Sequence, residues 1–230
     1  MRPIHLVLTL FAGLAAGCTC EEMPAQRRAP GEAPAQPAPP APKGAPITAA
    51  WSDNFDRAEL GPDWHATAPA YRIAGGALVV QTAYNHPLWL TRPLPRDAKI
   101  EFDCWSESDA GDLKVEVWGD GRSSATTRGQ YTSTAYNFIF GGWNNQISTL
   151  ARLNEHGADR KERSDVKVKK GQKYHWVITR KGGKVEWSID GQPFLAYDDT
   201  APLDGDDHRH FAINDWQAEL HFDNLTITPL

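Results

Sequence analysis

The sequence predicts an all-β domain, built as an antiparallel sandwich or a barrel. From residue 51 onwards, apolar and polar residues alternate in short runs, and Gly, Pro, Asn and Asp separate one run from the next. No window of about eleven residues sustains a helical period. The nine tryptophans all fall between Trp51 and Trp216, a span that suits one domain. Many short strands separated by turn residues are typical of sandwiches and barrels.

Two consecutive runs, 99–105 and 113–118, alternate most clearly. The first run carries Ile100, Phe102 and Cys104 on one face and Glu101, Asp103 and Trp105 on the other. The second carries Leu113, Val115 and Val117 on one face and Lys114, Glu116 and Trp118 on the other. We expect the apolar faces to form the core and the faces with acids and tryptophan to point outward.

Further runs follow along the chain. One face of each of the next two runs is listed here: Tyr136, Phe138 and Phe140, then Ile147, Thr149, Ala151 and Leu153. The runs 174–178 and 185–189 place Trp176 and Trp187 in the core, and Asp190-Gly191 predicts a tight hairpin turn after the second of them. The last strands are expected at 211–216 and 219–228, with a bulge near 223–224.

The N-terminus has the pattern of an export signal. Arg2 precedes an apolar run at 4–14, and small residues at 15–17 stand directly before Cys18. This arrangement resembles the bacterial lipobox, which implies cleavage of residues 1–17 and lipidation of Cys18, for example with palmitate. The alternative is an ordinary signal peptide with Cys18 incidental.

Residues 18–48 predict a disordered linker rich in Pro and Ala. They contain no aromatic residue, and such a composition cannot bury enough apolar surface to fold. Extended chain of this kind spans about 3.1 Å per residue, so the linker reaches on the order of 90 Å. We expect the domain of residues 49–230 to be exported and lipid-anchored at the cell envelope, and Thr19 in place of an aspartate favours the outer membrane.

Composition excludes two classes of protein. Residues 49–230 carry 20 Lys and Arg against 26 Asp and Glu, whereas a duplex-binding domain needs a basic surface, so we expect no nucleic-acid partner. The three cysteines, Cys18, Cys20 and Cys104, are too few for a disulfide scaffold and have no zinc-site spacing.

Five phrases resemble the concanavalin A-like lectin/glucanase superfamily, especially its laminin-G-like branch. They are Trp51-Ser-Asp-Asn-Phe-Asp56, Gly75-Gly-Ala-Leu-Val-Val80, His175-Trp-Val-Ile-Thr-Arg180, Val185-Glu-Trp-Ser-Ile-Asp-Gly191 and Phe222-Asp-Asn-Leu-Thr-Ile227. The resemblance covers the chain from about residue 50 and implies a two-sheet antiparallel jelly-roll β-sandwich. Many relatives bind glycans on one concave face, and a structural calcium often joins the termini. Asp53, Asp56 and Asp223 are suitable oxygen donors for that cation.

No catalytic set is assigned. The family 16 glycosidases of this superfamily place Glu, Asp and Glu on alternate residues of one strand. Glu101-Phe-Asp103 begins such a run, but Trp105 and Ser106 stand where the third acid should be. Jelly-roll lyases of the alginate-lyase type use Gln-Ile-His, whereas Gln146-Ile147 is followed here by Ser148.

A glycan-binding face is the preferred interpretation. Flat aromatic side chains stack on sugar rings, and acids or amides bind the hydroxyls. The candidate binding residues are Glu101, Asp103, Trp105, Glu116, Trp118, Trp143, Asn144, Asn145, Arg152, Asn214 and Trp216. The sequence therefore predicts a membrane-tethered carbohydrate-binding module without catalytic activity, whose partner is a glycan. The alternatives are a glycoside hydrolase or polysaccharide lyase, with Glu101, Asp103 and Glu116 the first residues to mutate, and a structural envelope protein that contacts another protein.

Overall fold

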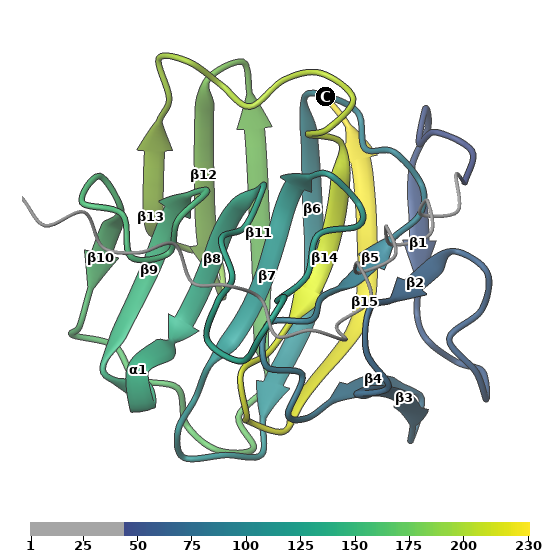
Figure 1. Cartoon of the computed structure of the whole chain (residues 1–230), viewed down its shortest axis with the longest axis vertical. Coiled ribbons are helices and arrows are strands. Elements are labelled where there is room, and N and C mark those ends of the chain that lie inside the picture. Colours follow the sequence, from purple (N-terminus) through teal and green to yellow (C-terminus); the bar gives the residue numbers. More distant parts are fainter. Residues whose placement is uncertain (1–43) are drawn as a thin grey trace, which may run out of the picture. The chain divides into compact units, whose positions relative to one another are not determined.

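The computed structural model describes residues 44–230, which form a sandwich of two antiparallel sheets (Figure 1). Sheet 1 consists, in spatial order, of β13 (Gln192–Asp198), β12 (Lys184–Ile189), β11 (Tyr174–Lys181), β6 (Ala98–Ser106), β15 (Leu220–Pro229), β4 (Ala77–Val80) and β3 (Tyr71–Ala74), with β1 (Trp51–Asp53) also paired to β15. Sheet 2 consists of β10 (Lys161–Arg163), β9 (Ile147–Arg152), β8 (Tyr136–Gly141), β7 (Leu113–Gly119), β14 (His210–Asn214), β5 (Leu88–Leu90) and β2 (Trp64–Ala66). The short turn α1 (Gly142–Asn145) joins β8 to β9.

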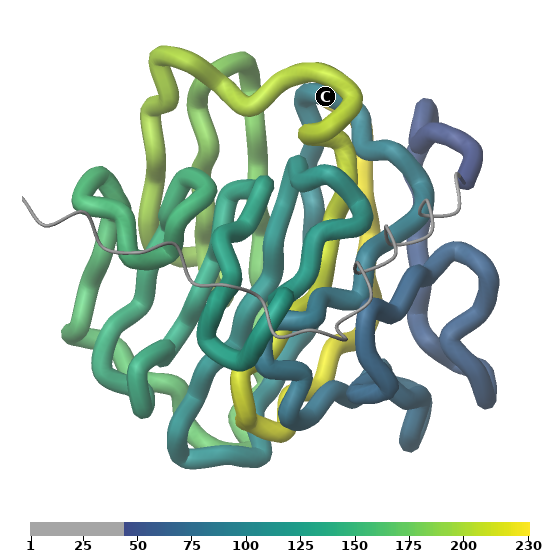
Figure 2. Tube along the Cα trace, in the orientation of Figure 1, coloured from purple at the N-terminus to yellow at the C-terminus, as the bar shows by residue number. Residues whose placement is uncertain are grey.

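The chain crosses repeatedly between the sheets, as the trace in Figure 2 shows. It passes from β6 in sheet 1 to β7 in sheet 2, returns from β10 to β11, and crosses again from β13 to β14. Consecutive strands with the same alternation therefore turn their polar faces to opposite sides of the sandwich.

The core lies between the sheets and confirms the predicted apolar faces. Every second residue of β6 is buried, among them Phe102, which lies 5.3 Å from the ring of Trp176. Trp176 in turn lies 4.4 Å from the Trp187 ring, and both indoles are almost fully excluded from solvent. Each such aromatic side chain removes on the order of 150–250 Å² from water, so these rings dominate the burial that stabilises the sandwich.

Two irregular features predicted from the sequence are confirmed. Asp190 and Gly191 both have positive φ, 50° and 75°, as the tight hairpin between β12 and β13 requires. The pairing of β15 with β6 shifts register between Asp223 and Thr226, and Asn224 has a φ of 54°. This is the predicted bulge near 223–224.

The described region also begins before the predicted domain start at residue 49. Ile47 is buried, and its N–H donates to the Pro93 carbonyl at 2.9 Å. The predicted signal peptide, Cys18 and the predicted linker up to residue 43 lie outside the described residues. Within residues 44–230 the model contains no helix that is both long and apolar enough to cross a membrane.

Candidate functional site

An open cavity of about 640 Å³ lies on the outer face of sheet 2. We call it the sheet 2 cavity. Its floor comes from β7 and β8, and its walls come from α1, the loop after β9, the β7–β8 connection and the segment between β14 and β15. The lining residues are Asn85, Ala110, Asp112, Lys114, Gly129, Tyr131, Ile139, Trp143, Asn144, Gln146, Glu155, His156, Trp216, Gln217 and Ala218.

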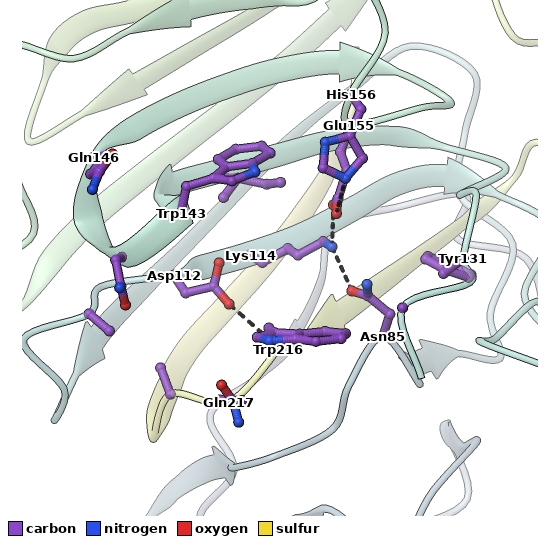
Figure 3. A pocket seen from close by; sticks show the side chains of 15 residues that line it. Asn85, Asp112, Lys114, Tyr131, Trp143, Gln146, Glu155, His156, Trp216 and Gln217 are labelled. Atoms are coloured by element: carbon purple, nitrogen blue, oxygen red, sulfur yellow. Dashed lines mark hydrogen bonds and ion pairs between the residues drawn. The ribbon is translucent and has the colours of Figure 1, made fainter. Parts of the chain in front are cut away.

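Two partly exposed tryptophans form opposite walls of this cavity. In Figure 3, Trp143 and Trp216 lie on either side of Asp112 and Lys114. The Trp216 ring packs edge-on against Tyr84 at 5.2 Å, and the Trp143 ring packs edge-on against His156 at 5.5 Å. Both indoles are therefore held in place while part of each ring remains accessible.

The position of Trp143 depends on an unusual backbone turn. Trp143, Asn144 and Asn145 follow one another with positive φ values of 51°, 59° and 60°. Asparagine tolerates this left-handed region because its short side chain can bond locally. Asn145 is also held by a distant segment, since its Nδ2 donates to the Val168 carbonyl at 2.7 Å and its Oδ1 accepts from the Val168 N–H at 2.9 Å. Asn145 thus fixes the turn that presents Trp143.

The cavity floor carries a buried lysine. The Lys114 Nζ donates to the Asn85 Oδ1 at 2.7 Å and to the Glu155 Oε2 at 2.5 Å. Burial alone would lower the pKa of Lys114, but the carboxylates of Glu155, Glu116 and Asp112 outweigh it and raise the pKa. Lys114 is therefore a fixed ammonium whose charge is balanced by Glu155.

Glu116 lies below the floor, fully excluded from solvent. Its Oε2 accepts hydrogen bonds from the Tyr131 hydroxyl at 2.7 Å and from the Ser133 hydroxyl, and its Oε1 accepts from the Asn214 Nδ2 at 2.6 Å. Burial raises the pKa of Glu116 in spite of these donors. Both oxygens are occupied, so Glu116 holds the floor together and does not face a ligand.

Asp112 is different, because one of its oxygens is uncommitted. Its Oδ2 accepts from the Trp216 backbone N–H at 3.1 Å, whereas its Oδ1 has no hydrogen-bond partner within the described part of the chain. Burial raises the pKa of Asp112 to about 6, more than the charge of Lys114 lowers it. Asp112 therefore presents a free acceptor beside Trp216 in the cavity wall.

A second acid, Asp215, is buried behind this wall. Its Oδ2 accepts from the Ala83 N–H at 3.2 Å, and its Oδ1 has no partner among residues 44–230. Burial, together with the charge of Asp112, raises the pKa of Asp215 to about 8. At neutral pH, Asp215 is therefore mostly protonated and Asp112 mostly ionised.

The structure brings together only some of the predicted binding residues. Trp143, Asn144 and Trp216 line the sheet 2 cavity, while Glu116 and Asn214 support its floor. Asn145 braces the α1 turn, as described above.

Glu101, Asp103 and Trp105 lie on the outer face of sheet 1, on the opposite side of the sandwich. Glu101 pairs with Lys99 at 2.6 Å, and Asp103 contacts the Nδ1 of His175 at 2.8 Å. The Trp105 ring stacks on His221 at 4.8 Å. The single groove predicted from these residues and the sheet 2 residues is therefore wrong, because β6 and β7 belong to different sheets.

Two further expectations are corrected by the core. Trp118 is fully buried, since a bulge between the pairs His210–Gly119 and Phe211–Val117 gives it a φ of 60° and turns it inward. Its Nε1 donates to the Pro95 carbonyl at 3.1 Å. Arg152 pairs opposite Tyr136, a core residue, so its side chain also points between the sheets.

Arg152 serves an internal ion pair. Its Nε donates to the Asp199 Oδ2 at 2.9 Å, and the Tyr136 hydroxyl donates to the same oxygen at 2.6 Å.

Five residues at or behind the cavity were not predicted from the sequence: Asp112, Lys114, Asn85, Glu155 and Asp215. The one sequence pattern that could have indicated them is the alternation of Asp112, Lys114 and Glu116 on one strand face. This pattern does not predict a buried site, because a lysine among acids is usually solvated.

The predicted calcium donors do not form one ligand set. The Oδ2 of Asp53 accepts from the Nη2 of Arg57 and the Nε1 of Trp64, both at 2.8 Å, and its Oδ1 accepts from the Phe55 N–H at 2.9 Å, so both oxygens are occupied. Burial would raise the pKa of Asp53, but these donors lower it. No group of three or more His, Cys, Asp or Glu side chains within residues 44–230 is arranged to hold a metal ion. We assign no metal to Asp53, Asp56 and Asp223.

Comparison with known proteins identifies the fold. No family model and no curated protein matches the chain in sequence. Among solved structures, a β-glucanase from Bacillus licheniformis aligns with a TM-score of 0.59 and 11% identity over 80% of this chain and 100% of that one. The carbohydrate-binding module CBM66 from Bacillus subtilis aligns with a TM-score of 0.53 and 12% identity over 74% and 98%. A laminarinase from Rhodothermus marinus aligns with a TM-score of 0.51 and 13% identity over 78% and 96%.

These likenesses confirm the predicted fold class. The domain is a concanavalin A-like jelly-roll sandwich of two antiparallel sheets. At such low sequence identities the comparisons establish the fold but not the function, because one fold serves many functions. The function has to be argued from the sheet 2 cavity itself.

Proposed function

We propose that this protein binds a glycan in the sheet 2 cavity without cleaving it, and that a lipid on Cys18 holds it at the cell envelope. The observation that carries the proposal is the pair of opposed indoles, Trp143 and Trp216, above a polar floor with the free oxygen of Asp112 between them (Figure 3).

Each part of the cavity matches what a sugar ring needs. The C–H faces of a sugar stack on flat aromatic rings, and a few fixed polar groups select its hydroxyls. Trp143 and Trp216 supply the rings, and Asp112 supplies an acceptor. The volume of about 640 Å³ lies within the range of about 300–1,000 Å³ usual for small-molecule sites.

The absence of cleavage is inferred from how the carboxylates are used. Hydrolysis of a glycoside requires two carboxyl groups facing the scissile bond. Glu116 is buried with both oxygens occupied, and Glu155 is committed to Lys114. Asp112 is then, among residues 44–230, the one lining carboxylate that no cationic side chain bonds directly.

The binding test uses the purified full-length protein in detergent and a panel of soluble and insoluble polysaccharides, with analysis of the products. We expect retention on at least one glycan, loss of retention in Trp143→Ala and Trp216→Ala, and no shortened oligosaccharides. Trp105→Ala, on the opposite face, is the matched control. Failure to bind any polysaccharide would contradict the proposal and favour a protein partner.

Hydrolysis is the second candidate, and one observation favours it. Burial raises the pKa of Asp112 to about 6, which is where a general acid is effective near neutral pH. Release of reducing ends that is lost in Asp112→Asn would establish this alternative. The solved structures of the same fold include a β-glucanase and a laminarinase, which is consistent with this alternative.

Tethering by Cys18 has its own test. Cells are fed an alkyne-tagged fatty acid, and the protein is isolated and coupled to a fluorescent azide. We expect wild-type protein to carry the label and to fractionate with membranes, and Cys18→Ala to lose both properties. An unlabelled wild-type protein would indicate an ordinary cleaved signal peptide.

A further inference from the structure

We infer that the glycan bound in the sheet 2 cavity carries a protonated amino group, which Asp112 binds between Trp143 and Trp216. The inference rests on the proposed function and names the class of sugar that the cavity selects: an amino sugar with a free ammonium group.

The first argument is the uncommitted acceptor. Every other charged side chain on the floor already has protein partners: Lys114 donates to Asn85 and Glu155, and Glu116 accepts from three donors. Asp112 is, among the described residues, the one lining carboxylate that no cationic side chain bonds directly, and its Oδ1 has no hydrogen-bond partner. An ammonium group donates up to three hydrogen bonds and would occupy it with a charge-assisted bond.

The second argument is the balance of charge. Asp112, Glu116 and Glu155 are three carboxyl groups in and below the floor, and Lys114 is the one cationic side chain among the lining residues. Asp215 behind the wall is mostly protonated at neutral pH, because burial and the charge of Asp112 raise its pKa to about 8, and it adds no charge to this balance. A cationic ligand offsets this excess, whereas a uronate or a sulfated sugar increases it.

The third argument is the character of the walls. Indole and phenol faces attract cations through their ring quadrupoles. The guanidinium of Arg160 lies 5.2 Å from the Trp143 centroid, and that of Arg128 lies 4.1 Å from the Tyr84 centroid and 5.8 Å from Trp216. Neither arginine lines the cavity, and Arg160 is paired with Glu162 at 2.9 Å. The same aromatic groups thus already hold cations at the rim.

The state of Asp112 supplies a measurable consequence. Its raised pKa of about 6 reflects the desolvation of a half-buried carboxylate, which the charge of Lys114 offsets only in part. A bound ammonium favours the ionised form, so near pH 6 binding of an amine that is already protonated should release a fraction of a proton from Asp112 to the buffer. A neutral sugar in the same place would not cause this release.

The experiment uses full-length protein in detergent and isothermal titration with paired oligosaccharides, each prepared with free amines and as its N-acetylated counterpart, on gluco and galacto backbones. Neutral glucans complete the panel. We expect the free-amine member of a pair to bind at least tenfold more tightly. We also expect heats near pH 6 that change with the ionisation enthalpy of the buffer for that member alone.

The matched variants are Asp112→Asn and, on the opposite face, Asp103→Asn. Asp112→Asn should bring the free-amine affinity down to that of the acetylated sugar, while Asp103→Asn should leave the difference intact. The comparison of paired ligands on the wild-type protein does not depend on whether a variant folds.

The outcomes separate the two proposals. Binding of acetylated or neutral glycans with equal or weaker binding of the amines overturns the present inference and leaves the proposed function standing. Absence of binding to every member of the panel overturns both. Tighter binding of the amines that persists in Asp112→Asn overturns the assignment of Asp112.

Discussion

The outer faces of the two sheets carry similar side chains in different surroundings. On sheet 1, Glu101 lies in a half-exposed ion pair with Lys99, and Trp105 stacks on His221. On sheet 2, Glu116 is fully buried and accepts from three donors, one of which is Tyr131, and the loops above it enclose a cavity. The cover supplied by loops, and not the strand pattern, turns one polar face into a candidate site.

The pKa values of acids on the two sides of the sandwich are shifted in opposite directions. Burial tends to raise the pKa of Asp103 on sheet 1, but bonds from His175 and Asn224 lower it overall. Behind sheet 2, burial prevails and raises the pKa of Asp215 to about 8. The same residue type is thus stabilised as an anion on one face and as a neutral acid on the other.

The largest effect is expected from removing an indole from the core. Trp118→Ala should lower the free energy of unfolding by about 3–5 kcal/mol, because it opens a large cavity among packed aromatic residues. Trp105→Ala, on the outer face of sheet 1, should cost less than about 1 kcal/mol, since the side chain is only partly buried. Urea unfolding followed by tryptophan fluorescence measures both. Equal losses would mean that Trp118 lies at the surface, as the strand alternation alone predicts.

The next effect comes from the buried acid. Glu116→Ala should lower the free energy of unfolding by about 3 kcal/mol, because it leaves Tyr131, Ser133 and Asn214 without their acceptor in a buried position. Glu101→Ala removes a half-exposed ion pair and should cost about 0–1 kcal/mol. Thermal unfolding by circular dichroism compares the two variants. A similar small loss in both would show that the floor network contributes little.

The two pairs of variants also show how much of the structure could be predicted from the sequence. The period-two alternation predicted the sandwich and most of the core, because one face of each strand must be buried. It also placed the bulge at 223–224 and the Asp190-Gly191 turn. The alternation gave the wrong face for Trp118, because an extra residue in the strand reverses the alternation there. No neighbouring residue type predicts that bulge.

The pairing of strands into sheets is the second feature that could not be predicted from the sequence. Runs 99–105 and 113–118 have the same pattern, and the sequence does not say that they belong to different sheets. Lys114 was expected only as part of an outward strand face, because lysine is rarely buried unless it is paired and its partner Glu155 lies 41 positions away. The site depends on such contacts between distant segments, which periodicity cannot supply.

A third, smaller effect concerns pH. The raised pKa of Asp215 means that the folded protein keeps a proton which the unfolded chain releases above about pH 4, so this group's contribution to stability is present at low pH and is lost as pH rises toward about 8. Asp215→Asn should therefore be more stable than wild type at pH 8, by about 2 kcal/mol after allowance for relaxation around the carboxylate, and the difference should shrink at pH 5.

The control for this prediction lies on the other face. The lowered pKa of Asp103 contributes stability above its unfolded pKa that is lost in acid, so Asp103→Asn should be destabilised at neutral pH and approach wild type as the pH falls. Urea denaturation from pH 2 to pH 8 follows both variants, and the change for Asp103→Asn is expected below about pH 4. Parallel pH profiles for Asp215→Asn and wild type would contradict the buried, protonated state of Asp215.

The smallest expected effect is the one that distinguishes the two faces as binding surfaces. Trp216→Ala should weaken glycan binding about tenfold, or about 1.4 kcal/mol, since it removes one stacking wall while the backbone N–H bonded to Asp112 remains. The fold should change little, because Trp216 is partly exposed. Trp105→Ala should leave the affinity unchanged, and affinity electrophoresis on a glycan that the wild-type protein retains measures both variants. If Trp105→Ala weakened binding and Trp216→Ala did not, the glycan site would belong to sheet 1, and the enclosed cavity of sheet 2 would need another ligand.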